Sequence, residues 1–371
     1  MLTIGIDASR VAVAQRTGTE RYSYELLQAL LHLDQLNRYT LYTNGIPANL
    51  PALPDNATLR SISFPRLWTH LRLGWEVQRH PPDVLFIPAH VVPLLRPPRK
   101  VQTVVTIHDL GYLAFPAAHT ARRRLELHMT TLWSAHTARR VIAISRATKL
   151  DLVRQYGVAP DKIHVVYHGL APAFRPVGDA AALAAVRARY GIPTERYLLY
   201  VGTIQPRKNL LRLIDAFAQV APTATPPVTL VLAGRRGWLT DQIEQRAAAL
   251  GVRQRVHFPG YIEDSDLPAL LSGAQAFVFP SLYEGFGMPV LEAMACGTPV
   301  LTSTISSLPE VAGEAALLVD PLSTDVIAGG LARLLNDAAL RDTLRDKGLL
   351  HAARFTWARC AAETLRVLSY L

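Results

Sequence analysis

Short apolar runs alternate with longer amphipathic stretches along the chain, and this alternation limits the possible folds more than any other feature of the sequence. The runs are rich in Val, Ile and Leu, which is typical of strands buried on both faces of a parallel sheet. Two sets of such runs predict an α/β protein with two doubly wound, Rossmann-like domains. The predicted strands cover residues 2–7, 40–43, 84–87, 102–107, 141–144 and 163–166, then 197–201, 229–233, 256–258, 276–279, 300–302 and 316–319.

The boundary between the two sets is expected near residues 168–178, where two prolines and two glycines disfavour both helix and central strand. We therefore expect an N-terminal domain over residues 1–173 and a C-terminal domain over residues 174–355. A last helix, expected from about Thr356 to Tyr370, carries Trp357, Leu365 and Leu368 and can pack on another element. We expect this segment, residues 356–371, to return to the N-terminal domain.

Composition restricts the class of protein. The chain has 371 residues, of which 50% are apolar and 18% charged, as in folded globular proteins. No apolar run approaches the roughly 20 residues of a membrane-spanning helix. The first seven residues begin a strand pattern directly, so we expect no signal peptide and a cytoplasmic protein. The two cysteines, Cys296 and Cys360, have no metal-type ligand close in sequence and are expected to be reduced thiols.

Positive charge is concentrated in the first half of the chain. Residues 1–173 hold 20 Lys and Arg against 11 Asp and Glu, whereas residues 174–371 hold 19 against 18. A basic half can serve solubility alone, or it can bind nucleic acid, anionic lipid or a phosphorylated substrate. The aromatic residues are not interleaved with basic ones as they are in nucleic-acid modules, so we expect no nucleic-acid partner.

Ligands of open parallel sheets bind beyond the carboxyl ends of the strands, and two loops of the first half end such strands. Gly18 precedes a predicted helix, where a glycine lets the backbone approach a phosphate, although a plain tight turn explains it equally well. The loop lacks the G-x-G-x-x-G fingerprint, which disfavours hydride chemistry. His108 and Asp109 end the run 102–107; they are candidates for acid–base chemistry, for binding sugar hydroxyls, or for a structural role.

The first strand of the second half ends in a basic turn. Gly202 is followed by Arg207 and Lys208 just before a predicted helix. Arg can contact two phosphate oxygens at once and Lys adds a point charge, so this pair can hold a diphosphate. A solvated basic turn would have the same sequence pattern.

A fourth loop carries two carboxylates. Gly285 and Gly287 flank Phe286, and Pro289 stands where the first turn of a helix favours proline. Such a loop can present backbone N–H groups to an anion. Glu284 lies in the loop and Glu292 about one turn into the helix. A carboxylate in this apolar helix requires a partner or a ligand.

This segment, Glu284-Gly-Phe-Gly-Met-Pro-Val-Leu-Glu292, resembles the E-x7-E signature of the family-4 retaining glycosyltransferases, which have the GT-B fold. The other motifs follow in the family's order: Gly18, then Thr106-Ile-His-Asp-Leu110, then Arg207-Lys-Asn209. Phe355-Thr-Trp357 is similar to the family's entry into its final returning helix. The resemblance covers nearly the whole chain and is strongest over residues 197–320.

The resemblance implies a role for each candidate residue. Glu284 would bind the donor sugar, with His108 contacting its hydroxyls from the other domain, and Arg207 and Lys208 would bind the diphosphate. Many members carry Arg after the glycine at the position of Gly202, whereas this chain has Thr203, which leaves Arg207 and Lys208 as the expected basic clamp. The remaining donor-binding residues would contact phosphate, sugar or ribose: Gly18, Gly202, Gly285, Phe286, Gly287 and, on the ribose, Glu292.

The resemblance also implies the reaction. Family members retain the anomeric configuration and need no divalent metal or other cofactor, since basic residues and helix ends stabilise the phosphates. The chain has no D-x-D motif and no evident carboxylate pair for double displacement. The motifs look like the mannosyltransferase branch, so we expect mannose transfer from GDP-mannose, with a UDP-sugar as second choice. They do not exclude a GT-B sugar-nucleotide epimerase, which needs no acceptor, or a noncatalytic sugar-binding protein.

The expected acceptor is a glycan or a lipid-linked glycan of cell-surface polysaccharide or glycolipid synthesis. Residues 66–79 place Leu67, Leu71 and Trp75 at helical spacing among arginines, and 122–124 and 139–140 add further arginines. This composition suits a helix on an anionic bilayer, at the inner face of the cell membrane, or an ordinary packed helix.

Overall fold

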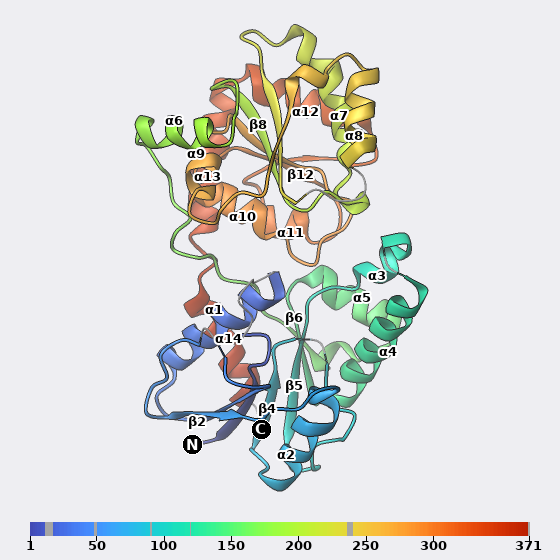
Figure 1. Ribbon diagram of the computed structural model, residues 1–371, viewed down its shortest axis with the longest axis vertical. Helices are drawn as coiled ribbons and strands as arrows, with labels where there is room; N and C mark the ends of the chain where they lie inside the picture. Colours follow the sequence, from blue (N-terminus) through green and yellow to red (C-terminus); the bar gives the residue numbers. More distant parts are fainter. Residues whose placement is uncertain (12–17, 48–49, 90, 119, 236–239, 370–371) are drawn as a thin grey trace. The chain divides into compact units, whose positions relative to one another are not determined.

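The computed structural model describes residues 1–371 except 12–17, 48–49, 90, 119, 236–239 and 370–371. The chain divides into two compact units: unit 1 comprises Met1–Gly169 with Phe355–Leu371, and unit 2 comprises Leu170–Arg354. Each unit is a parallel sheet with helices on both faces (Figure 1), which confirms the predicted α/β class.

Unit 1 contains a sheet of seven parallel strands within the described residues, in the order β3-β2-β1-β4-β5-β6-β7. Six of them match the predicted runs. The seventh, β3, is an edge strand in which only Ala57 is buried, and it therefore lacks the apolar run that marks the others. The strands are β1 (Thr3–Asp7), β2 (Arg38–Thr43), β3 (Ala57–Ser61), β4 (Val84–Ile87), β5 (Gln102–Ile107), β6 (Arg140–Ala143) and β7 (Ile163–Val165).

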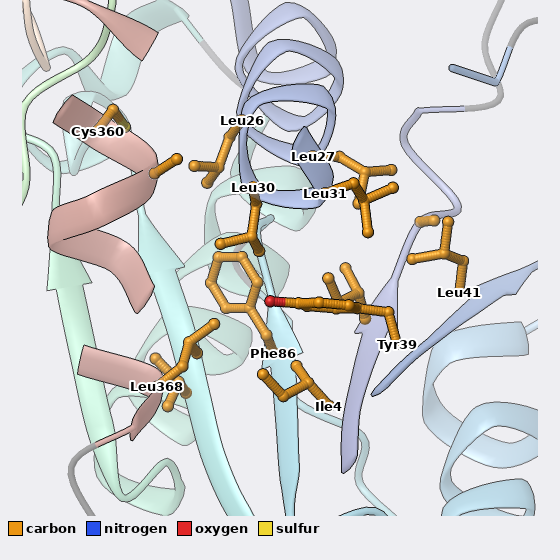
Figure 2. Close-up of a cluster of buried hydrophobic side chains, with 14 of the residues drawn as sticks. Ile4, Leu26, Leu27, Leu30, Leu31, Tyr39, Leu41, Phe86, Cys360 and Leu368 are labelled. Atoms are coloured by element: carbon orange, nitrogen blue, oxygen red, sulfur yellow. The ribbon is translucent and has the colours of Figure 1, made fainter. Parts of the chain in front are cut away.

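Helices α1 (Gly18–Leu33) and α14 (Trp357–Ser369) pack against each other over one face of this sheet. Leu26 and Leu30 of α1 and Leu368 of α14 meet Phe86 of β4 in one buried cluster (Figure 2). The C-terminal helix thus belongs to unit 1, as predicted, because its apolar stripe completes a core that α1 covers only in part.

The opposite face of the same sheet is covered by α4 (Ala121–Thr137), α5 (Arg146–Tyr156) and a helical segment over residues 68–79. The segment predicted as a helix over 66–79 is helical over residues 68–79: its first part is the π-helix η1 (Trp68–Leu73), which continues directly into α2 (Gly74–Arg79). A Cβ at Gly74 would lie 2.7 Å from the carbonyl oxygen of Leu95, so the close approach of that segment requires glycine. Shorter elements of unit 1 are α3 (Gly111–Ala114), η2 (Pro116–Ala118) and η3 (Pro160–Lys162).

Unit 2 contains six parallel strands among the residues described, in the order β10-β9-β8-β11-β12-β13. All six correspond to predicted runs. They are β8 (Tyr197–Val201), β9 (Thr229–Ala233), β10 (Val256–Gly260), β11 (Ala276–Phe279), β12 (Val300–Ser303) and β13 (Leu317–Val319). The helices are α6 (Ala180–Arg189), η4 (Pro206–Lys208), α7 (Leu210–Val220), η5 (Ala221–Thr223), α8 (Thr240–Ala249), η6 (Arg253–Arg255), α9 (Leu267–Ser272), α10 (Met288–Ala295), α11 (Leu308–Ala312), α12 (Thr324–Asn336) and α13 (Ala338–Ala352).

The middle of the unit 2 sheet positions the candidate site. Strands β8, β11 and β12 are neighbours, and their carboxyl ends lie at the same edge. The loops that follow them therefore converge, although they are far apart in sequence. In the part of the chain that the structure describes, no helix is long and apolar enough to cross a membrane.

Candidate active site

The loop after β8 is fixed at both of its ends. Gly202 has φ +150°, and a Cβ there would lie 2.8 Å from the Tyr200 hydroxyl, so only glycine fits. At the far end, Asn209 adopts a left-handed conformation and its amide donates to the carbonyl oxygens of Pro280 at 3.1 Å and Pro321 at 2.7 Å. The short helix η4, which carries Arg207 and Lys208, is thereby held against the ends of β11 and β13.

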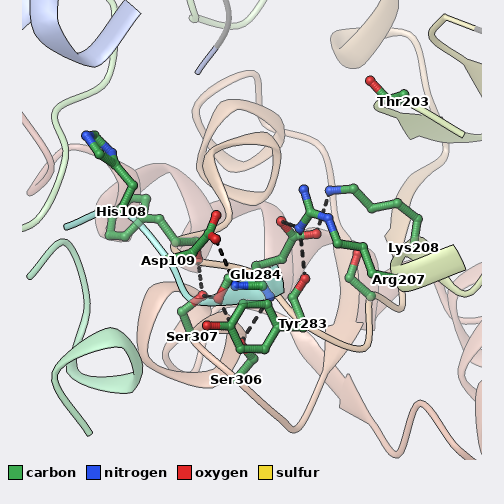
Figure 3. A network of polar contacts seen from close by, with 12 residues as sticks. His108, Asp109, Thr203, Arg207, Lys208, Tyr283, Glu284, Ser306 and Ser307 are labelled. Atoms are coloured by element: carbon green, nitrogen blue, oxygen red, sulfur yellow. Dashed lines mark hydrogen bonds and ion pairs between the residues drawn. The ribbon is translucent and has the colours of Figure 1, made fainter. Parts of the chain in front are cut away.

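Arg207, Lys208 and Glu284 meet at this edge of the sheet (Figure 3). The Lys208 Nζ lies 2.5 Å from one carboxylate oxygen of Glu284, and an Arg207 guanidinium nitrogen lies 2.7 Å from the other. The side chains of Lys208 and Glu284 are each 8% exposed. Two cations therefore share one buried carboxylate, and the three together carry one net positive charge at a strand-end loop.

The protonation state of Glu284 follows from these contacts. Burial alone would raise the pKa of its carboxyl group, but Lys208 and Arg207 outweigh burial and hold the pKa below its ordinary value. Glu284 is thus ionised at neutral pH and holds both cations in place.

Two serines that the sequence patterns did not indicate hold the Glu284 loop. The Ser306 hydroxyl accepts from the Glu284 backbone N–H at 3.0 Å and donates to its carbonyl oxygen at 2.7 Å. The Ser307 hydroxyl lies within hydrogen-bond distance of the carbonyl oxygens of Glu284 and Phe286, at 3.0 and 2.6 Å. Both serines lie beside Glu284 (Figure 3) and follow the end of β12, the strand that pairs with β11. Their position just after a predicted strand was the sequence feature that could have identified Ser306 and Ser307 as site residues.

Replacing Ser306 by alanine should lower kcat/KM about tenfold, because loss of both hydroxyl contacts lets the Glu284 loop shift relative to Arg207 and Lys208. Ser306 has φ +61°, so glycine retains the backbone conformation and tests the hydroxyl alone. Steady-state kinetics of S306A and S306G measure the effect. The control is S323A, which removes only the cap of α12 and should cost about 1 kcal/mol of stability. Unchanged kinetics of S306G would contradict the positioning role.

Helix α10 begins at the loop that Glu284 opens. Gly287 precedes it with φ +114°, which favours glycine, and Pro289 lies in its first turn. Glu292 is buried at 7% exposure among Val290, Leu291 and other helix residues with no exposed surface. The structure thus places Glu292 in the apolar setting that the sequence indicated, on the helix that follows the glycine loop.

His108 and Gly18 lie in unit 1. The His108 ring is buried, and its Nε2 lies 2.8 Å from the Pro88 carbonyl oxygen, which accepts the Nε2 proton. Burial lowers the pKa of His108 despite this hydrogen bond and the charges of Asp109 and Glu20, so the ring is neutral at pH 7 with Nδ1 as an acceptor. Gly18 is the first residue of α1 and is exposed, and a Cβ there would meet no described atom within 4 Å.

Thr203 is exposed in the loop after β8 and places no cation there. In the described ranges, no three His, Cys, Asp or Glu residues come together as metal ligands.

Comparison with known proteins links this geometry to a family. The family described as "Glycosyltransferase Family 4" matches residues 16–174, and that described as "Glycosyl transferases group 1" matches residues 184–350. The chain is 30% identical over 372 residues to the O-antigen chain mannosyltransferase B of Escherichia coli, with 96% of each chain covered.

Solved structures agree at the level of the fold. The sucrose-phosphate synthase of Thermosynechococcus elongatus superposes with a TM-score of 0.75 at 23% identity, covering 99% of this chain and 98% of that one. Anabaena HepE in complex with UDP and glucose superposes with a TM-score of 0.73 at 18% identity, covering all of both chains. The fold, the E-x7-E loop with its two cations and the full-length similarity lead to one conclusion: the chain belongs to the group 1, family-4 glycosyltransferases, hexosyl-transferring enzymes with the GT-B fold.

Proposed function

We propose that this glycosyltransferase transfers mannose from GDP-mannose, with retention of configuration and without a divalent metal, to a glycan or lipid-linked acceptor of cell-surface polysaccharide or glycolipid synthesis. The observation that carries the proposal is the placement of Arg207 and Lys208 on one buried carboxylate, Glu284. The choice of mannose is supported by the full-length relative, which is a mannosyltransferase. The acceptor class is supported by the same relative, whose name refers to the O-antigen chain.

The arrangement gives each group a chemical task. Arg207 and Lys208 would contact the diphosphate and stabilise the charge that develops as the bond between the anomeric carbon and the phosphate oxygen breaks. Glu284 would accept hydrogen bonds from sugar hydroxyls while it keeps both cations in place. On the proposed same-face path, the acceptor hydroxyl bonds to the anomeric carbon and its proton passes to the departing phosphate. Glu292 would accept from the two ribose hydroxyls.

A panel of nucleotides should identify the donor. GDP and GDP-mannose should each raise the melting temperature, because a ligand at a hundred times its Kd adds about 2.7 kcal/mol of stability. UDP and UDP-glucose should have little effect. Thermal-shift measurements across the panel provide the test. Stabilisation by UDP alone would show that the donor is a UDP-sugar and not GDP-mannose. If no nucleotide raised the melting temperature, the proposed function would be wrong.

Removing divalent metal should leave the activity unchanged. Two cationic side chains already lie where the diphosphate is proposed to bind, and they can stabilise its charge without an ion. Initial rates with and without EDTA provide the measurement. Activity that EDTA abolishes and manganese restores would contradict the metal-independent mechanism.

A lipid-linked acceptor places the reaction at a membrane, and we propose peripheral contact with anionic lipid at the inner face of the cell membrane. The basic character of residues 1–173 supports this contact. Nucleic acid is not proposed as a partner.

A further inference from the structure

One face of unit 1 combines exposed apolar side chains with arginines. Helices η1, α2 and α4 lie on the same face of the sheet, with residues 93–96 beside them: the Leu95 N–H donates to the His70 carbonyl oxygen at 3.2 Å, and the Arg96 guanidinium lies 4.8 Å from the centre of the Trp133 ring. We call this the α2–α4 surface. Its exposed apolar residues are Leu67, Leu71, Trp75, Leu94, Leu125 and Met129.

The first part of α4 contributes no buried side chain to the hydrophobic core. Residues 121–126 are all exposed, and the buried residues of this helix are confined to Thr131, Ser134 and Ala135. Leu125 is 62% exposed and Met129 is 55% exposed, one turn apart on the helix. An isolated stretch of this kind gains little from its own packing. Arg122, Arg123 and Arg124 give it a net positive charge, although Arg123 pairs with Glu126 at 2.8 Å.

The neighbouring helix has the same composition. Trp75 is exposed in α2, and the guanidinium groups of Arg72 and Arg79 lie 4.7 and 4.6 Å from the centre of its ring. An exposed aromatic ring with two guanidinium groups against it places apolar and positively charged surface side by side, which matches the boundary between lipid headgroups and acyl chains.

A pocket opens between α4 and Arg96. Its volume is about 260 Å³, and it is lined by Arg96, Met129, Leu132, Trp133, His136 and Thr137. The Trp133 Nε1 is buried and has no hydrogen-bond partner among the described residues. A space that is lined by the apolar side chains of Met129 and Leu132 together with the cation Arg96 suits the glycerol and phosphate region of a lipid.

We infer that the α2–α4 surface docks on an anionic phospholipid bilayer, with Leu125, Met129 and Trp75 at the acyl boundary, and that the Trp133 pocket receives part of one lipid. Charge complementarity determines the choice of occupant, since Arg72 and Arg79 lie against Trp75 and three consecutive arginines precede Leu125 in α4. The inference rests on the proposed function, because a membrane-linked acceptor gives the contact its purpose. The sequence pattern indicated residues 66–79 as the membrane-contacting segment, whereas the structure places the centre of the proposed membrane contact on α4.

Sedimentation with vesicles tests the surface. L125E/M129E should partition onto phosphatidylcholine–phosphatidylglycerol vesicles at least about tenfold less than the wild-type chain. The matched control is L322E/L350E, which adds the same charge at two exposed leucines of unit 2. R122Q/R123Q/R124Q should lose about fivefold per charge removed at low salt. All substituted positions are exposed, so circular dichroism and melting temperature should not change.

Quenching of tryptophan fluorescence by brominated phosphatidylcholine in the same vesicles tests the orientation. The wild-type chain should be quenched, and W75F and W133F should each be quenched less. Equal partitioning of L125E/M129E and its control would overturn the inference, as would absence of binding to anionic vesicles at low salt. Stabilisation by GDP without vesicles separates the two proposals: if GDP stabilises L125E/M129E as it does wild type, a loss of vesicle binding concerns the surface alone.

Discussion

Lys208→Met should lower kcat/KM at least about a hundredfold, the typical effect of removing one preorganised charge that stabilises a departing group. Methionine keeps most of the side-chain volume beside Phe279, whose ring centre lies 4.7 Å from the Lys208 Nζ, so the change removes mainly charge. The loss should appear chiefly in kcat if Lys208 acts on the leaving phosphate in the transition state. Steady-state kinetics with a fixed acceptor provide the measurement.

The same variant should also be less stable, because Glu284 retains only Arg207 inside a buried site. Removing one partner of a buried ion pair costs about 3–5 kcal/mol, and the remaining arginine should hold the loss near the lower value. Lys347→Met, at an exposed position of α13, is the matched control and should change neither kinetics nor stability. A K208M enzyme with wild-type kcat/KM would show that Arg207 alone, or another group, neutralises the phosphate.

Glu284→Gln should lower kcat/KM by a similar factor of about a hundred. Glutamine has nearly the same shape, but it cannot balance two cations, and Arg207 and Lys208 should then move apart by mutual repulsion. Glu284→Asp is the informative companion, since it keeps the charge but withdraws it from the contacts at 2.7 and 2.5 Å. Activity in the order wild type, E284D, E284Q would favour charge positioning, whereas the order wild type, E284Q, E284D would favour direct sugar contact by the full-length side chain.

The pH dependence of stability provides a second measurement on Glu284. Its pKa in the folded protein is lowered, so the folded state binds this proton less tightly than the unfolded chain does. The resulting stabilisation is complete above the unfolded pKa of about 4.3 and is lost as pH falls through the lower folded pKa. Denaturant unfolding should therefore show E284Q less stable than wild type at pH 7, with a smaller difference below about pH 4. A difference that did not change with pH would rule out the ion pairs as its cause.

Local sequence patterns were sufficient for most elements of the fold. Every predicted strand exists because a strand in the middle of a parallel sheet is buried on both faces and must be apolar along its length. Strand β3 and the change from π-helix to α-helix at Gly74 were not predictable in this way. An edge strand such as Ala57–Ser61 can be polar, and the need for glycine at position 74 comes from Leu95, which lies 21 residues further along the chain.

Some features of the candidate site could also be predicted from local sequence, and others depend on the tertiary structure. The spacing of Glu284 and Glu292 and the basic turn at Arg207 and Lys208 are local features, and they led to the family that the full-length relative supports. The direct pairing of Glu284 with both cations joins residues 76 and 77 positions apart, and the neighbouring strands β8 and β11 bring them together.

The alternation of apolar runs was thus sufficient to determine the class of fold, and the E-x7-E segment was sufficient to determine the family. Both are local patterns, formed by residues that are close together in sequence. Tertiary structure alone decided that Ser306 holds the Glu284 backbone, that Glu284 is ionised between two cations, and that α4 presents Leu125 and Met129 to solvent. Each of these depends on which surfaces meet and which are left uncovered once the sheets have formed, and no short stretch of sequence carries that information.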